Sequence, residues 1–474
     1  MYKQAQFGLL LILISIDLIL SLTAPNNVCK TFEGYYTNKD CYYNADQISE
    51  VPDIVKRHNY SLEEYEVTTT DGYILKIFRI PNGDPQSQPV LLQHAILASS
   101  PAGAAATRNS SGYILKIFRI PNGDPQSQPV LLQHAILASS VNFLIIGNHS
   151  LGFILANEGY DVWLGNFRGT RYFQQAQISE APDIPTGTNT SKNPIKSIGI
   201  LASTNLGITT FDELGHYDVA ATIDLIHKTT NKSTIYIGYS LGAIAGHVYS
   251  SVYPDEAPTK IKVMISMAPA TLIETSQSIL RFLRPFWSTL QKLIIAQNHG
   301  ELFARNGPLI KYIRSVCFPY PHQLKMCLGF IQLAFGLNED QINPETLPVT
   351  LYHDGDSTSI KTVVHLSQVA ASRKFRKFDY GEFMNLEIYN SSSPPVYNLT
   401  AIKVPNHLIY GKGDFVAGKK AVSDLYQRLS KIGRKYGVYA VKHDSFAHTD
   451  FIIGRDVKKL VYDHIVEFLK KIKN

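Results

Sequence analysis

The stretch that decides the fold is Thr234-Ile235-Tyr236-Ile237, followed directly by Gly238-Tyr239-Ser240-Leu241-Gly242. The first four residues predict a buried strand, and the small residues from Gly242 to Gly246 predict a helix packed closely on it. A sharp turn between them needs small residues at both glycine positions, because side chains there would collide with the strand and the helix. Such a turn holds the serine hydroxyl clear of the backbone. We therefore predict a nucleophile at Ser240, the alternative being an ordinary Gly-Ser turn.

Around this stretch, short β-branched runs alternate with segments of helical periodicity. Helical spacing of apolar residues precedes it over 214–226, and further strands are expected at 261–265, 407–410 and 438–441. An amphipathic pattern over 457–468 closes the chain. This alternation predicts an α/β fold with a mainly parallel central sheet. We expect a core formed by residues 25–270 and 391–474, with a mostly helical, aromatic-rich cap at 271–390 inserted between core strands.

The amino terminus predicts entry into the secretory pathway. A lysine at position 3, an apolar run from Phe7 to Leu20 and small residues up to Ala24 form the pattern of a signal peptide over residues 1–24. A membrane anchor is the alternative, but the run is short for a span and contains Asp17. We expect a secreted or lysosomal protein without a permanent membrane anchor.

The four cysteines lie in two close pairs, Cys29 with Cys41 and Cys317 with Cys327. In an oxidising compartment this arrangement suggests two local disulfides, with metal binding as the alternative, although neither pair has the short spacing of a zinc site. The net charge of +6 is spread along the chain, which does not favour nucleic acid as a partner. Seven Asn-x-Ser/Thr sequons are compatible with glycosylation, at Asn59, Asn109, Asn148, Asn189, Asn231, Asn390 and Asn398.

Residues 72–100 recur without a substitution at 112–140. Two copies do not make a solenoid, which needs at least three units to bury a core. We expect only one copy to join the sheet and the other to form an appended hairpin or a loosely packed excursion. A weaker echo of residues 47–54 at 177–184 indicates an insertion around 171–205.

A serine hydroxyl needs a base, and the base needs an orienting acid. On this fold the chain order is serine, then acid, then histidine. Asp414 follows the strand expected at 407–410, and His448 lies between the last expected strand and the closing helix. His443 and Asp444 are rivals close by, so spacing alone leaves the assignment of Asp414 and His448 open.

A series of collinear sequence words resembles the acid lipase family, which includes gastric lipase, lysosomal acid lipase and many insect lipases. The words cover most of the chain apart from the repeat and the expected insertion. They are Glu64–Tyr73, Gly159–Asn166 with Arg168-Gly169, Phe211–Asp218, the Ser240 turn, Pro394–Thr400 and the His448 loop.

The resemblance implies an α/β-hydrolase that cleaves lipid esters, triacylglycerols or sterol esters, through an acyl-enzyme at a lipid–water interface. The family's nucleophile falls on Ser240, its acid on Asp414 and its base on His448. Its oxyanion donors fall on the backbone N–H groups of Leu241 and Ile136, or of the repeat's Ile96. We choose Ile136 because its copy runs directly into the family-like words that follow. The family's cap disulfide falls on Cys317 and Cys327, and no cofactor or metal is implied. The oligomeric state is not indicated.

Three departures from the family bear on activity. Ala135 replaces a glycine, which would displace or strain the oxyanion hole if that backbone must adopt a positive φ or allow close approach. Tyr239 and Leu241 stand where the family usually has histidine and glutamine, although a backbone donor survives either change. The expected insertion disturbs the stretch that leads into the Phe211 word. The alternative to an active lipase is therefore a catalytically impaired, lipase-like protein that binds or stores lipid.

Overall fold

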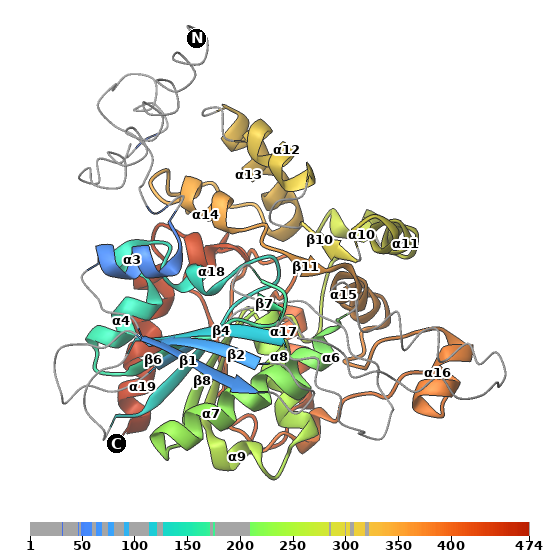
Figure 1. Ribbon diagram of the computed structural model, residues 1–474, viewed down its shortest axis with the longest axis horizontal. Coiled ribbons are helices and arrows are strands. Elements are labelled where there is room, and N and C mark those ends of the chain that lie inside the picture. The colour runs from blue at the N-terminus through green and yellow to red at the C-terminus, as the bar shows by residue number, and fades with distance from the viewer. Residues whose placement is uncertain are drawn as a thin grey trace, which may run out of the picture.

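The computed structural model contains a single large sheet flanked by helices, with further helices gathered above it (Figure 1). Six neighbouring strands run parallel: β6 (Asp161–Leu164), β5 (Pro129–Gln133), β8 (Thr234–Tyr239), β9 (Ile261–Met267), β12 (Asn406–Tyr410) and β13 (Val438–Ala440). The predicted α/β fold with a mainly parallel sheet is confirmed. The structure describes residues 31, 46, 49–58, 63–68, 74–79, 90–93, 113–120, 127–170, 174–175, 209–283, 286–298, 300–303, 308–317 and 322–473.

The parallel strands are buried on both faces, and alternate residues separate into two hydrophobic clusters. Val130, Leu132 and Ile237 pack with α4 (Leu151–Asn157) and α19 (Asp463–Lys473) on one face. Leu131 and Tyr236 pack on the other face, with α7 (Ala220–Thr230), α8 (Leu241–Val252) and α17 (Lys419–Arg428). The core is therefore a three-layer sandwich whose strands end at one common edge.

Both copies of the repeat contribute strands to the sheet, so the expectation that only one would join it was wrong. β2 (Ile74–Arg79) and β4 (Tyr113–Ile120) share the sequence Ile-Leu-Lys-Ile-Phe-Arg, and its two copies pair parallel and in register. β1 (Glu63–Thr68) continues the sheet beyond β2. β3 (Val90–Gln93) likewise pairs with its twin β5. Identical strands have the same alternation of residues, so each copy is equally suited to extend the sheet.

The second copy is tied to the core by an ion pair. Arg119 in β4 donates to both carboxylate oxygens of Asp161 at 2.9 and 2.8 Å, and its guanidinium lies 4.2 Å from the centre of the Trp163 ring. The Trp163 indole N–H also donates to Asp161. Because these groups are buried, the bidentate pair satisfies a charge that would be costly alone.

The segment between β9 and β12 is mostly helical, as expected. Its antiparallel strand pair, β10 (Glu301–Leu302) and β11 (Thr358–Ser359), is short. In Figure 1 most of its helices lie above the sheet, and α16 extends to one side. These helices are α10 (Leu280–Leu283), α11 (Trp287–Asn298), α12 (Pro308–Cys317), α13 (His322–Phe335), α14 (Leu347–His353), α15 (Ile360–Ser372) and α16 (Glu382–Tyr389).

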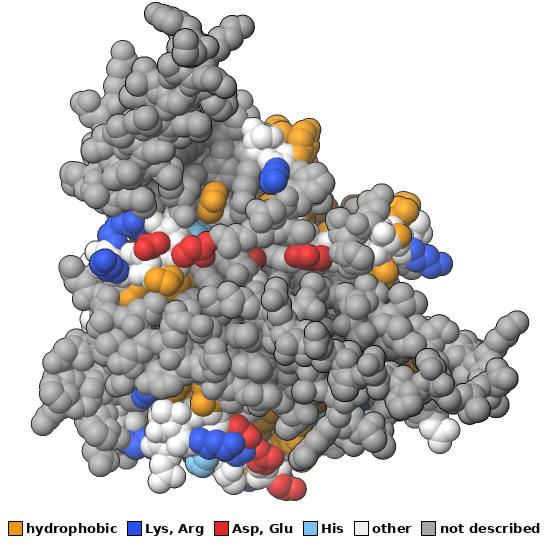
Figure 2. Space-filling model, viewed as in Figure 1, with side chains coloured by type: hydrophobic (Ala, Val, Ile, Leu, Met, Phe, Trp, Pro, Cys, Tyr) orange, Lys and Arg blue, Asp and Glu red, His pale blue; other side chains and the backbone are white. Residues whose placement is uncertain are grey.

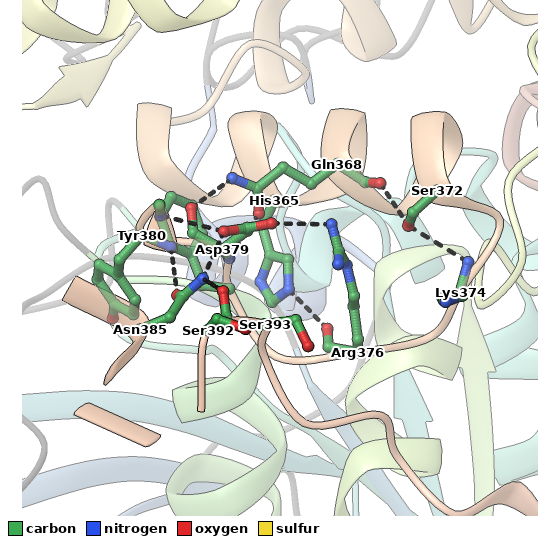
Figure 3. Close-up of polar contacts among 12 residues, drawn as sticks. His365, Gln368, Ser372, Lys374, Arg376, Asp379, Tyr380, Asn385, Ser392 and Ser393 are labelled. Atoms are coloured by element: carbon green, nitrogen blue, oxygen red, sulfur yellow. Dashed lines mark hydrogen bonds and ion pairs between the residues drawn. The ribbon is translucent and has the colours of Figure 1, made fainter. Parts of the chain in front are cut away.

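The return from this helical segment is fixed by a polar network around Asp379 (Figure 3). Its carboxylate accepts hydrogen bonds from Arg376, from the Gly381 backbone N–H and from Asn385 at 2.8–3.0 Å. Gln368 on α15 exchanges two hydrogen bonds with the Asp379 backbone. These hydrogen bonds hold the loop between α15 and α16 against α15 and the start of α16.

Several predictions fall outside the described residues. These are the signal peptide at 1–24, Cys29 and Cys41, and nearly all of the insertion expected at 171–205, of which only β7 (Gln174–Gln175) is described. Within the described ranges, no helix has both the length and the apolar character needed to cross a bilayer.

Candidate active site

Ser240 lies at the sharp turn between β8 and α8. Its backbone has φ 53° and ψ −109°, and its N–H donates to the Met267 carbonyl at 2.9 Å. A methyl group on Gly238 would lie 2.7 Å from the Ala243 nitrogen, and one on Gly242 would overlap Gln133. Both glycines are thus required by close backbone approach, as the sequence predicted, and the strained serine is held by its neighbours.

His448 lies within hydrogen-bond distance of both Ser240 and Asp414. Its Nδ1 is 2.8 Å from the Asp414 Oδ2 atom, and its Nε2 is 2.9 Å from the Ser240 Oγ atom. An ionised carboxylate only accepts, so Nδ1 carries the proton and Nε2 is free to accept from the serine hydroxyl. The three side chains come from three loops at the same edge of the sheet and are all buried. This arrangement suits proton removal from Ser240.

The other oxygen of Asp414 is fixed by the backbone. Oδ1 accepts N–H groups from Val416 at 2.7 Å and Ala417 at 2.8 Å. The carboxylate is thereby oriented with Oδ2 toward His448. The rival Asp444 instead forms a surface ion pair with Lys412 at 2.6 Å.

The two proposed oxyanion donors line the same cavity as Ser240 and His448. Leu241 is the first residue of α8, so its N–H has no partner within the helix. Ile136 lies in the loop after β5. Ala135 does not have a positive φ; among the described residues the positive φ in this loop belongs to Leu137, at 61°. The Leu137 carbonyl accepts N–H groups from Gly355 and Asp356 at 2.8 and 3.1 Å, which hold the loop in place.

Two cavities meet at Ser240. The larger, of about 470 Å³, is lined almost entirely by apolar side chains from the core and from α10, α11 and α15. The smaller, of about 260 Å³, also contains Tyr239, Asn142 and Asp354. Ile136, Phe335 and His448 line both, so they form the neck between the two. An extended apolar ligand with a polar centre would place that centre at Ser240.

The predicted bond between Cys317 and Cys327 is present and joins α12 to α13. Both helices contribute side chains to the smaller cavity, including Ile313 and Ile331. The disulfide therefore braces one wall of the site.

Over the part of the chain that the structure describes, no three His, Cys, Asp or Glu side chains gather as a metal-binding group would.

Comparison with known proteins gives the family. A family model described as a partial α/β-hydrolase lipase region matches residues 51–102 and 110–147, which takes in both copies of the repeat. A gastric triacylglycerol lipase from Homo sapiens is 30% identical over 423 residues, covering 87% of this chain and 89% of that protein. The chain belongs to the acid lipase family. A gastric triacylglycerol lipase from Bos taurus is 28% identical, covering 91% of this chain and 93% of its own, and lipase member K from Homo sapiens is 26% identical, covering 92% and 94%.

This acid lipase has the α/β-hydrolase fold, and membership of the family supports a carboxylic ester hydrolase. Tyr239, which replaces the family's usual histidine, donates its hydroxyl to the His448 carbonyl at 2.7 Å. Burial, together with the nearby Asp414 carboxylate, raises the pKa of Tyr239 well above its usual value, so the phenol stays protonated as a donor. Tyr239 thus supports the His448 loop through this hydrogen bond, a role that the sequence did not predict.

A second missed residue in this acid lipase is Asp450, two residues beyond His448. Its Oδ2 atom accepts the Ala447 N–H at 2.7 Å and the Asn338 amide at 2.5 Å. Burial raises the pKa of Asp450 to about 7, against the opposing effect of these hydrogen bonds. The word Ala447-His448-Thr449-Asp450 contained the signal, a carboxylate two residues after the histidine.

Proposed function

We propose that this acid lipase is a serine hydrolase that cleaves carboxylic esters of lipids, triacylglycerols or sterol esters, through an acyl-enzyme. The observation that carries the proposal is the hydrogen-bonded series Asp414–His448–Ser240 at the mouth of an apolar cavity of about 470 Å³. A base that lies 2.8 Å from the acid and 2.9 Å from the nucleophile suits acyl transfer.

In the first step His448 Nε2 takes the Ser240 proton while Oγ attacks the ester carbonyl carbon. Asp414 keeps the proton on Nδ1 and stabilises the imidazolium that forms. The tetrahedral intermediate collapses when His448 returns the proton to the leaving alcohol, which breaks the ester C–O bond and leaves an acyl group on Ser240. Water activated by His448 then releases the fatty acid.

The negative charge on the intermediate develops on the former carbonyl oxygen. The N–H groups of Leu241 and Ile136 are the donors proposed for it, and each such donor contributes about 3–4 kcal/mol of transition-state stabilisation. The absence of a positive φ at Ala135 is consistent with a donor at Ile136. The acyl chain occupies the larger cavity because its walls are apolar.

The proposal includes the organisation and destination of the chain. Residues 271–390 act as the cap over a core made of 25–270 and 391–474, and residues 1–24 act as a cleaved signal peptide. The substrate is met at a lipid–water interface, outside the cell or in the lysosome.

The test is covalent labelling of the mature chain with a fluorophosphonate, followed by peptide mapping of the adduct. We expect one adduct, on Ser240, and none in Ser240→Ala. Hydrolysis of an emulsified triacylglycerol and of a sterol ester is then measured on the same sample. A folded sample that gives no Ser240 adduct would overturn the enzyme proposal and leave the alternative, a lipid-binding or storage protein on a lipase scaffold.

A further inference from the structure

A short segment of the cap touches the loops of both the acid and the base. The segment runs from Phe335, the last residue of α13, to Gln341. The Phe335 carbonyl accepts the N–H of His448 and the N–H of Phe415, each at 3.3 Å. Phe415 is the neighbour of Asp414, so one cap oxygen connects the backbones of both loops. The Phe335 ring also stacks on His448, with ring centres 5.7 Å apart and planes 18° from parallel.

Gly336 brings the cap backbone into direct contact with the residues that precede Asp414 and His448. Its φ is +130°, and a methyl group there would overlap the Gly413 carbonyl and lie 2.8 Å from the Ala447 Cβ atom. The Gly413 N–H in turn donates to the Phe446 carbonyl at 3.0 Å. Acid loop, base loop and cap thus meet backbone to backbone, at a distance that only glycine at 336 permits.

Asn338 extends the contact to both sides of the base. Its amide nitrogen donates to Asp450 at 2.5 Å, and its amide oxygen accepts the Ser445 hydroxyl at 3.4 Å. Gln341 follows with three hydrogen bonds of 2.9 Å each: its carbonyl accepts the Arg455 N–H, its side-chain oxygen accepts the Asp456 N–H, and its side-chain nitrogen donates to the Asp456 carboxylate. The loop from Ser445 to Asp456 is therefore held by the cap before and after His448.

We infer that residues 335–341 form a positioning clamp that sets the distance between Asp414 and His448. The inference rests on the proposed function. Gly336, Asn338 and Gln341 do not line the cavities at Ser240, whereas the Phe335 ring does. The clamp acts through the backbone of the loops that carry the acid and the base. Because a misplacement of about 1 Å can cost 10²-fold in rate, the cap contributes to the chemical step as well as covering the acyl cavity.

The test compares Gly336→Ala with Gly329→Ala. Both glycines lie at or in α13, but a methyl group on Gly329 would have nothing within 4 Å. The substrate is a short, soluble p-nitrophenyl ester, which does not need the apolar cap helices for binding. We expect Gly336→Ala to lower kcat by roughly 10–100-fold with KM within about twofold of wild type, and Gly329→Ala to match wild type. The rate of phosphonylation of Ser240 should fall in parallel.

Asn338→Ala provides a second variant if Gly336→Ala does not fold, and it should lower kcat by roughly tenfold without a change in KM. Folding of each variant is checked by its thermal unfolding transition. Wild-type kcat in folded Gly336→Ala or Asn338→Ala, or a loss confined to KM, would overturn the clamp while leaving the proposed function intact. Failure of wild type itself to label at Ser240 would overturn both.

Discussion

The loops that carry Ser240, Asp414 and His448 form the floor of the site, and α10–α13 form its roof; the two differ in what they bury. On the floor these polar side chains are only 3–6% exposed. On the roof large apolar side chains face outward, with Phe282, Tyr312 and Phe330 each more than 60% exposed. Figure 2 shows hydrophobic side chains at the outer ends of this helical region.

Both the buried polar side chains of the floor and the exposed apolar side chains of the roof carry a free-energy cost in water, for opposite reasons. Buried polar groups lose hydration unless they are paired, and the floor groups are paired with one another and with backbone N–H groups. Exposed apolar side chains gathered in one region mark a surface that meets a partner. In the proposed function the floor performs the chemistry and the roof contacts a lipid phase, and the clamp inferred at 335–341 joins them.

The largest effect should come from the floor. Ser240→Ala should lower ester hydrolysis by roughly 10⁶-fold, and Asp414→Asn by roughly 10⁴-fold, because the latter leaves the nucleophile but stabilises the wrong tautomer of His448. Initial rates on the soluble p-nitrophenyl ester measure both. Lys412→Ala, which removes only the surface partner of Asp444, serves as the control. Comparable rates in Asp414→Asn and wild type would remove Asp414 from the mechanism.

The sequence was most informative where the backbone is tightest. The turn at Gly238–Gly242 and the core strands were predictable because close approach and burial restrict which residues fit there. The placement of Asp414 and His448 needed the family resemblance, because spacing did not separate them from His443 and Asp444.

Contacts between distant segments were not predictable. Tyr239 and His448 are 209 residues apart, and nothing near Tyr239 indicates which carbonyl its hydroxyl meets. Gly336 resembles any glycine that ends a helix until the Gly413 loop is placed against it. The prediction for the repeat was wrong for a related reason. A strand pattern shows that a segment can pair with a neighbour, but it does not show how many copies a sheet can contain.

The second largest effect concerns the junction of floor and roof. Because the pKa of Asp450 is raised from 3.8 to about 7, the folded state holds a proton there that the unfolded state loses. Its contribution to the free energy of unfolding is therefore present below pH 3.8 and is lost as pH rises to 7, roughly 4 kcal/mol in all. Asp450→Asn should abolish this loss. Urea unfolding at several pH values measures it, and parallel pH dependences for the two proteins would contradict the assignment.

A buried histidine on α8, His247, should give the free energy of unfolding the opposite pH dependence. His247 on α8 contacts Thr271 and Asn406, and burial lowers its pKa from 6.5 to about 4. The unfolded state therefore gains a proton first on acidification. Stability is lost as pH falls from 6.5 to 4, by roughly 3 kcal/mol. His247→Gln should flatten this acid limb, even if the lost contacts lower stability at every pH. An acid limb of unchanged steepness would mean that His247 has the same pKa in the folded and the unfolded protein.

The smallest effect should come from single residues of the roof. Moving one phenylalanine from water into lipid is favourable by about 1.5–3 kcal/mol, so Phe282→Ser or Phe330→Ser should weaken binding to phospholipid-coated emulsion droplets by roughly tenfold or more. Hydrolysis of the soluble ester should not change, because both side chains point outward.

Phe383 provides the matched control for this last prediction. It is 74% exposed, more than either roof phenylalanine, but it lies on α16, away from α10–α13 (Figure 1). If exposure alone drives adsorption, Phe383→Ser will weaken droplet binding as much as the roof substitutions do. If the roof is the lipid-facing surface, Phe383→Ser will bind like wild type. Only the second result preserves the distinction between a floor that performs the chemistry and a roof that finds the substrate.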